Sequence, residues 1–104
     1  MMYTKRQLYS FTARMYRLFE QKPELFTLKK LRGVHGWCIK DEDKWDEILL
    51  DYRRDLIAAL IHETIHYIYD DWSERRVEEM ERNILNQLSL CQIKNIIKRF
   101  AVII

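Results

Sequence analysis

Glycine and proline are scarce in this chain, whose 104 residues include two glycines and one proline. A fold of many short strands needs such residues at its tight turns, so their scarcity disfavours an all-β sandwich or barrel. Helices joined by short connections are favoured instead. Two domains would each be too small to bury a good core, so we expect a single domain over residues 1–104.

Long apolar runs and paired cysteines are also missing. No run of about 18 apolar residues exists, which argues against a membrane-spanning helix, and the first 19 residues lack the continuous apolar segment of a secretory signal. Cys38 and Cys91 are far apart in sequence and match no metal-binding pair. We therefore expect reduced thiols and a cytoplasmic location. A net charge of +2 neither demands nor excludes a nucleic-acid partner.

The N-terminal half predicts one helix followed by a small sheet. Apolar residues recur every three or four positions over residues 4–21, and Thr4 and Gln7 have the spacing of a capping box. Residues 37–41 and 45–51 flank an acidic turn and predict two strands. The apolar residues Phe26, Leu28 and Leu31 lie among basic ones and predict a short strand at best, so we expect a small antiparallel sheet of about three strands.

The C-terminal half predicts three helices, which makes the expected fold class α+β. The run from residue 52 or 53 to about residue 69 is apolar, lacks glycine and proline, and is too long for a strand, so it predicts a mostly buried helix. Two amphipathic helices are expected after it, over residues 73–87 and 90–102.

One charged residue interrupts the most apolar run, and it is flanked by two histidines. His62, Glu63 and His66 form the pattern H-E-x-x-H. On a helix, residues four apart lie about 6 Å apart on one face, so both imidazoles can hold one metal ion. Glu63 lies about 100° round the helix, where it can reach a metal-bound water without being a ligand. Because three polar groups in an apolar helix are costly unless something pairs with them, we predict a Zn²⁺ site with Glu63 as general base.

The third ligand must come from another element. A catalytic zinc needs three protein ligands and one open position. The residues after His66 lack the glycine and third histidine of the metzincins. Asp70 lies eight residues from His62, about 12 Å along the helix axis, so one ion cannot take both of them together with His66. His35, in a turn next to Gly36, is one remaining candidate.

Two glutamates of the following helix are the other candidates. Glu74 and Glu81 both lie within about 60° of the centre of its apolar face. Either one can be the third ligand, and the other can accept a hydrogen bond from a ligand histidine. Glu74 has an alternative role in the first turn of the helix, where it complements the dipole, and Glu81 has one in an ion pair with a nearby arginine.

The order of these segments resembles the zinc-dependent metallopeptidases of the zincin fold. It is most similar to the small single-domain metallopeptidase-like proteins encoded by tailed bacteriophages, over roughly Gly33 to Arg99. In related zincins an E-x-x-A/V segment on the following helix begins with the third ligand, and this segment maps onto residues 74–77 here. The resemblance therefore implies His62, His66 and Glu74 as ligands, with Glu81 as the fallback.

The resulting prediction is a gluzincin-like zinc metallopeptidase that hydrolyses peptide bonds in a protein or peptide substrate. If the chain is phage-encoded, its location would be the host cytoplasm. The alternative is a zinc-binding interaction or regulatory module with little or no catalytic activity. A weaker third option, association with nucleic acid, depends on the basic residues of the last expected helix, Lys94, Lys98 and Arg99.

Overall fold

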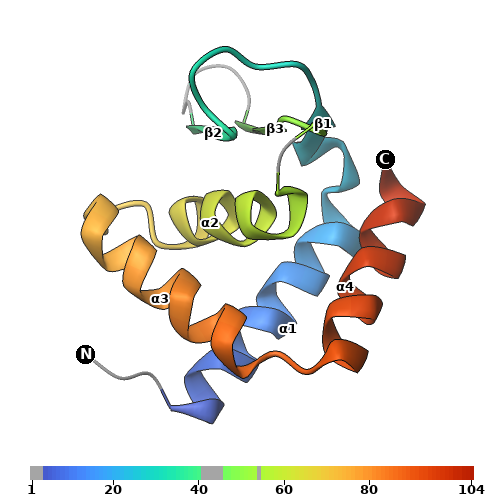
Figure 1. Cartoon of the computed structure of the whole chain (residues 1–104). Helices are drawn as coiled ribbons and strands as arrows, with labels where there is room; N and C mark the ends of the chain where they lie inside the picture. Colours follow the sequence, from blue (N-terminus) through green and yellow to red (C-terminus); the bar gives the residue numbers. More distant parts are fainter. Residues whose placement is uncertain (1–3, 41–45, 54) are drawn as a thin grey trace.

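The computed structural model describes residues 4–40, 46–53 and 55–104. Within these ranges the chain has the expected α+β class (Figure 1). Its elements in order are α1 (Lys5–Gln21), the 3-10 helix η1 (Pro23–Leu25), β1 (Phe26–Leu28), β2 (Gly36–Lys40), β3 (Asp46–Leu50), α2 (Leu56–Ile68), α3 (Glu74–Gln87) and α4 (Leu90–Ile103). None of the helices in the described ranges is long and apolar enough to cross a lipid bilayer.

Polar residues fix where the four α-helices of the described chain begin. In each case a side-chain oxygen accepts a hydrogen bond from a backbone N–H in the first turn, and the four capping residues are Thr4, Asp55, Ser73 and Ser89. The capping box predicted for Thr4 and Gln7 is confirmed. Each such cap contributes about 1 kcal/mol to helix stability, so the sequence sets the start of the central helix α2 through Asp55.

The sheet has the strand order β1–β3–β2, with β2 at one edge. β2 pairs with β3 in antiparallel register, as expected for the two strands around the acidic turn, whose residues 41–44 lie outside the described ranges. β1 pairs with β3 in parallel register, so the sheet is mixed rather than wholly antiparallel. The reason is that β3 inserts between β1 and β2. It runs opposite to β2, which itself runs opposite to β1.

α2 lies between the sheet and the remaining helices (Figure 1). It contacts β2 and β3 on one side and α3 on another. Its side chains Leu60, Ile61 and Ile65 are fully buried, as are Ile48 and Leu50 of β3. Protein interiors are packed as densely as organic crystals, so a helix held in this way presents its remaining side chains in fixed directions.

Candidate metal centre

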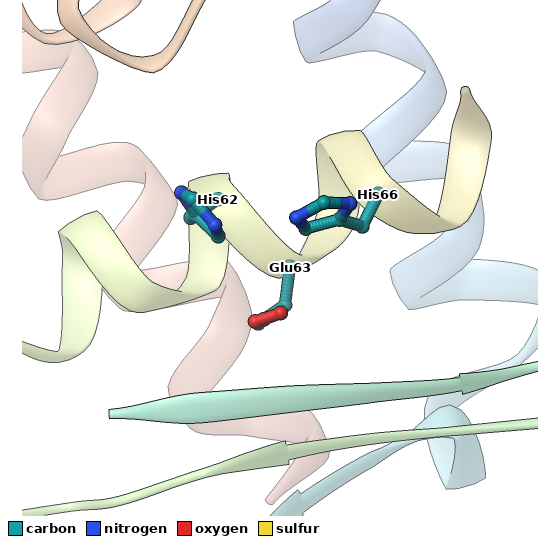
Figure 2. A group of neighbouring side chains, drawn as sticks. All are labelled: His62, Glu63 and His66. Carbon is teal, nitrogen blue, oxygen red and sulfur yellow. The ribbon is translucent and has the colours of Figure 1, made fainter. Parts of the chain in front are cut away.

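The three residues of the H-E-x-x-H pattern lie together on α2. Figure 2 shows His62 and His66 along the helix and Glu63 pointing toward the strands. The centroids of the two imidazole rings lie 4.9 Å apart. Ligand-type atoms of the three residues lie within 4.8 Å of one another. The two imidazoles are partly exposed, whereas Glu63 is buried between α2 and the sheet.

Glu74 contacts both histidines, in each case at the Nε2 atom of the imidazole ring. Its Oε1 lies 2.7 Å from His62 Nε2, and its Oε2 lies 2.8 Å from His66 Nε2. Ser73 is the N-cap of α3, so Glu74 is not needed to cap that helix. Two imidazole nitrogens and one carboxylate that converge in this way form a donor set that zinc prefers.

Glu81 approaches His62 from the other side of the ring. Its Oε1 lies 3.1 Å from His62 Nδ1. Glu81 accepts a hydrogen bond from Nδ1–H, so Nε2, which faces Glu74, is the ring nitrogen that could bind a metal once it has lost its own proton. The hydrogen bond to Glu81, helped by the charges of Glu74 and Glu63, raises the pKa of His62 to about 9 in the metal-free protein.

Glu63 is the buried carboxylate of the group. Burial raises its pKa, and the neighbouring His62 and His66 partly oppose that rise. An acid whose pKa is moved toward neutral can accept a proton and later release it, as a general base that becomes a general acid must do. The chemistry expected of Glu63 is therefore compatible with its surroundings.

Two adjoining hollows open onto these residues. One, of about 650 Å³, extends along β2 to Lys40 and Asp70. The other, of about 600 Å³, extends along α2 and includes His62, Glu74 and Glu81. Four residues line both of them, namely Val34, Gly36, Glu63 and His66. Hollows of this size accommodate a small ligand or a short stretch of peptide.

The other candidates considered from the sequence occupy different places. His35 lines the second hollow, and its backbone carbonyl accepts a hydrogen bond from the N–H of Asp51. Asp70 pairs with Lys40, whose Nζ lies 3.3 Å from its Oδ2. Among the described residues, the group whose possible metal-binding atoms lie within 4.8 Å of one another is His62, Glu63 and His66, so neither His35 nor Asp70 belongs to it, and Glu74 joins the site only through its contacts with the two imidazoles. Burial raises the pKa of the Cys38 thiol to about 11, so Cys38 stays protonated at neutral pH.

Two residues beside the site were missed by the sequence-based prediction. Gly36 lies so close to Glu63 that a Cβ at residue 36 would be 2.8 Å from Glu63 Cγ, and Lys40 donates a hydrogen bond from Nζ to the backbone oxygen of Tyr67 at 3.0 Å. Gly36 carries a signal, because it is one of only two glycines and immediately precedes the strand expected over residues 37–41. Lys40 carries none, because a lysine at a strand end usually faces solvent.

Comparisons of the chain with protein-family models, curated proteins and solved structures gave no match. The resemblance to zincin metallopeptidases stays a prediction from the sequence. What can be argued further about function comes from the side chains gathered on α2 and α3.

Proposed function

We propose that the protein is a zinc-dependent metallopeptidase. The observation that supports this best is the convergence of His62 Nε2 and His66 Nε2 on the carboxylate of Glu74, at 2.7 and 2.8 Å, beside the buried Glu63. Two imidazoles and a glutamate are the ligand set of many catalytic zinc sites, which keep a fourth position open. The adjoining hollows leave room for a substrate at that position.

Four side chains have separate roles in the proposed binding of the metal. His62 and His66 would offer Nε2 and Glu74 its carboxylate, while Glu81 accepts a hydrogen bond from Nδ1–H of His62, so that Nε2 is the nitrogen that gives up its proton to the metal. A zinc ion bound by these groups would supply the acidity that brings the pKa of water to about 7 and the positive charge that polarises a peptide carbonyl.

Glu63 moves the proton. Its carboxylate takes a proton from the attacking water and delivers it to the leaving amine as the peptide bond breaks. The buried position between α2 and β2 keeps bulk water away from the carboxylate, and it raises the pKa of Glu63 toward the range that such a transfer needs.

The test combines metal analysis with peptidase assays on the purified chain. We expect one zinc per chain, removal of activity by a chelator, and recovery on adding zinc. Glu63→Gln keeps the size of the side chain but removes the base. It should therefore retain zinc and lose at least about a hundredfold in kcat, which is within the usual contribution of a general base.

The matched control is Glu78→Gln, an exposed glutamate of α3 away from both hollows, which should leave zinc content and kcat unchanged. Protein without stoichiometric zinc would contradict the site itself. If the protein binds stoichiometric zinc but Glu63→Gln leaves its activity unchanged, the non-catalytic interaction module would be favoured instead. The same holds if the zinc-bound protein cleaves no peptide.

A further inference from the structure

Gly36 is the first residue of the edge strand β2, and its backbone does not require glycine. Of the two glycines, only Gly33 has a positive φ, of 76°. Glycine within a strand destabilises the strand, because its backbone loses more conformational entropy on folding and it has no side chain to pack. Where it is nevertheless found, another group often approaches the backbone closely.

The group that approaches Gly36 is the side chain of Glu63. A Cβ atom at residue 36 would lie 2.8 Å from Glu63 Cγ and 3.3 Å from Glu63 Cδ. It would also lie 3.2 Å from the backbone oxygen of Leu49, which belongs to the neighbouring strand β3. Because that oxygen is part of the paired sheet, the backbone cannot easily withdraw. A side chain at position 36 therefore displaces Glu63.

We propose that Gly36 is a positioning residue for Glu63, leaving the space in which the carboxylate lies beside the metal helix. The inference rests on the proposed function for its catalytic consequence, but its steric part stands on the contacts alone. Glu63 is only 7% exposed and is enclosed between α2 and β2, so a shift away from residue 36 takes the carboxylate out of its place beside His62 and His66.

The first test is Gly36→Ala in the full chain. We expect stoichiometric zinc, a KM near that of the wild type, and a kcat reduced at least tenfold, because the ligands stay in place while the base moves. Gly33→Ala is the matched control. Its φ of 76° makes alanine strained, but among the described residues other than its chain neighbours no atom lies within 4 Å of the added Cβ. It should lower the melting temperature, and its kcat should fall much less than that of Gly36→Ala, because Glu63 is not displaced. A Gly36→Ala enzyme with wild-type kcat would overturn the proposal.

A second test does not depend on activity. Glu63→Ala removes the Cγ and Cδ atoms that residue 36 would meet, so the two substitutions should not be additive in unfolding free energy. We expect Gly36→Ala to destabilise the wild type clearly more than it destabilises Glu63→Ala. If Gly36→Ala alone fails to fold, the double variant should recover folding. Equal destabilisation in both backgrounds, or no recovery, would overturn the proposal.

The two tests separate the failure of this inference from that of the proposed function. A wild-type protein that binds zinc but cleaves no peptide would contradict the peptidase, and the unfolding cycle would still decide whether Gly36 holds Glu63 in place. An active enzyme whose two substitutions are additive would keep the peptidase and reject the role of Gly36.

Discussion

Glu74 and Glu81 are two helical turns apart on α3, and they contact opposite nitrogens of the same imidazole. Glu74 faces His62 Nε2, whereas Glu81 faces His62 Nδ1. Only Glu74 also reaches His66. The two carboxylates therefore occupy different positions, and in the proposed zinc site Glu74 would be a ligand while Glu81 would accept a hydrogen bond from the ligand His62.

These positions predict unequal effects on zinc affinity. Glu74→Ala removes a ligand and should abolish stoichiometric binding in dilute protein. Glu81→Ala removes only the acceptor behind His62 and should weaken binding by about 10- to 100-fold. Titration with zinc against a competing chelator measures both, with Glu78→Ala as the control. A larger loss of zinc affinity for Glu81→Ala than for Glu74→Ala would indicate that Glu81 is the ligand and Glu74 the hydrogen-bond acceptor.

At the scale of the elements, Lys40 of the edge strand β2 contacts the C-terminal end of α2. Lys40 Nζ donates to the backbone oxygen of Tyr67 at 3.0 Å, pairs with Asp70 at 3.3 Å, and lies 4.8 Å from the centre of the Tyr67 ring. The oxygen of Tyr67 belongs to the last turn of α2, where a cation is favourable because of the helix dipole.

Loss of this contact should loosen the C-terminal end of α2. Lys40→Met keeps the length of the side chain but removes the charge and all three contacts. We expect the free energy of unfolding to fall by about 1 kcal/mol, since the lysine is partly exposed and solvent screens its ion pair. Chemical denaturation measures this change. Lys29→Met, at an exposed position outside the strands, should change stability much less.

The loop between β1 and β2 is anchored by a buried carboxylate. Asp51 accepts hydrogen bonds from the backbone N–H of Leu31, from the backbone N–H of Arg53 and from the guanidinium of Arg53. The hydrogen bond from the guanidinium holds the pKa of Asp51 well below its usual value, and the two backbone donors lower it further. This loop carries Val34 and His35 to the rim of the site.

A lowered pKa sets the sign of the pH dependence. The ionised Asp51 stabilises the fold above its unfolded pKa of about 3.9, and the contribution is lost as the pH falls through the lower folded value. Asp51→Asn should therefore destabilise the protein strongly at pH 7, and the gap to the wild type should narrow below about pH 4. Melting temperatures between pH 2 and 7 test this, with the exposed Asp71→Asn as control; a gap that is constant with pH would contradict it.

At the scale of the whole molecule, the sequence predicts elements better than it predicts their pairing. Periodicity locates the four helices of the described ranges, because that signal is local, but the helix expected from residue 52 or 53 begins at Leu56, where the cap Asp55 sets its start. The parallel pairing of β1 with β3 joins residues about twenty positions apart, and no local signal carries it. The sequence does not predict the close approach of Gly36 and Glu63 for the same reason. It arises only when β2 packs against α2, which leaves no room for a Cβ atom at residue 36.

In the candidate site, too, the sequence predicts what lies on one helix better than what depends on packing between helices. His62, Glu63 and His66 lie on one helix, so their spacing alone places them together. Glu74 and Glu81 belong to another helix, and their separate positions depend on how α3 crosses α2. Sequence reasoning left both open until the resemblance ranked them, whereas the packed helices place each carboxylate at a different nitrogen of His62.

Because the proposed ligands come from two helices, zinc should stabilise the whole fold. An ion that binds His62 and His66 on α2 and Glu74 on α3 binds only the folded chain, and it stabilises that chain by about 2.7 kcal/mol at a free concentration of one hundred times Kd. Removing zinc with a chelator should therefore lower the melting temperature by several degrees, and adding zinc back should restore it. His62→Ala should show no response to zinc, whereas His35→Ala should respond like the wild type. A melting temperature that is the same with and without zinc would show that no ion joins α2 to α3.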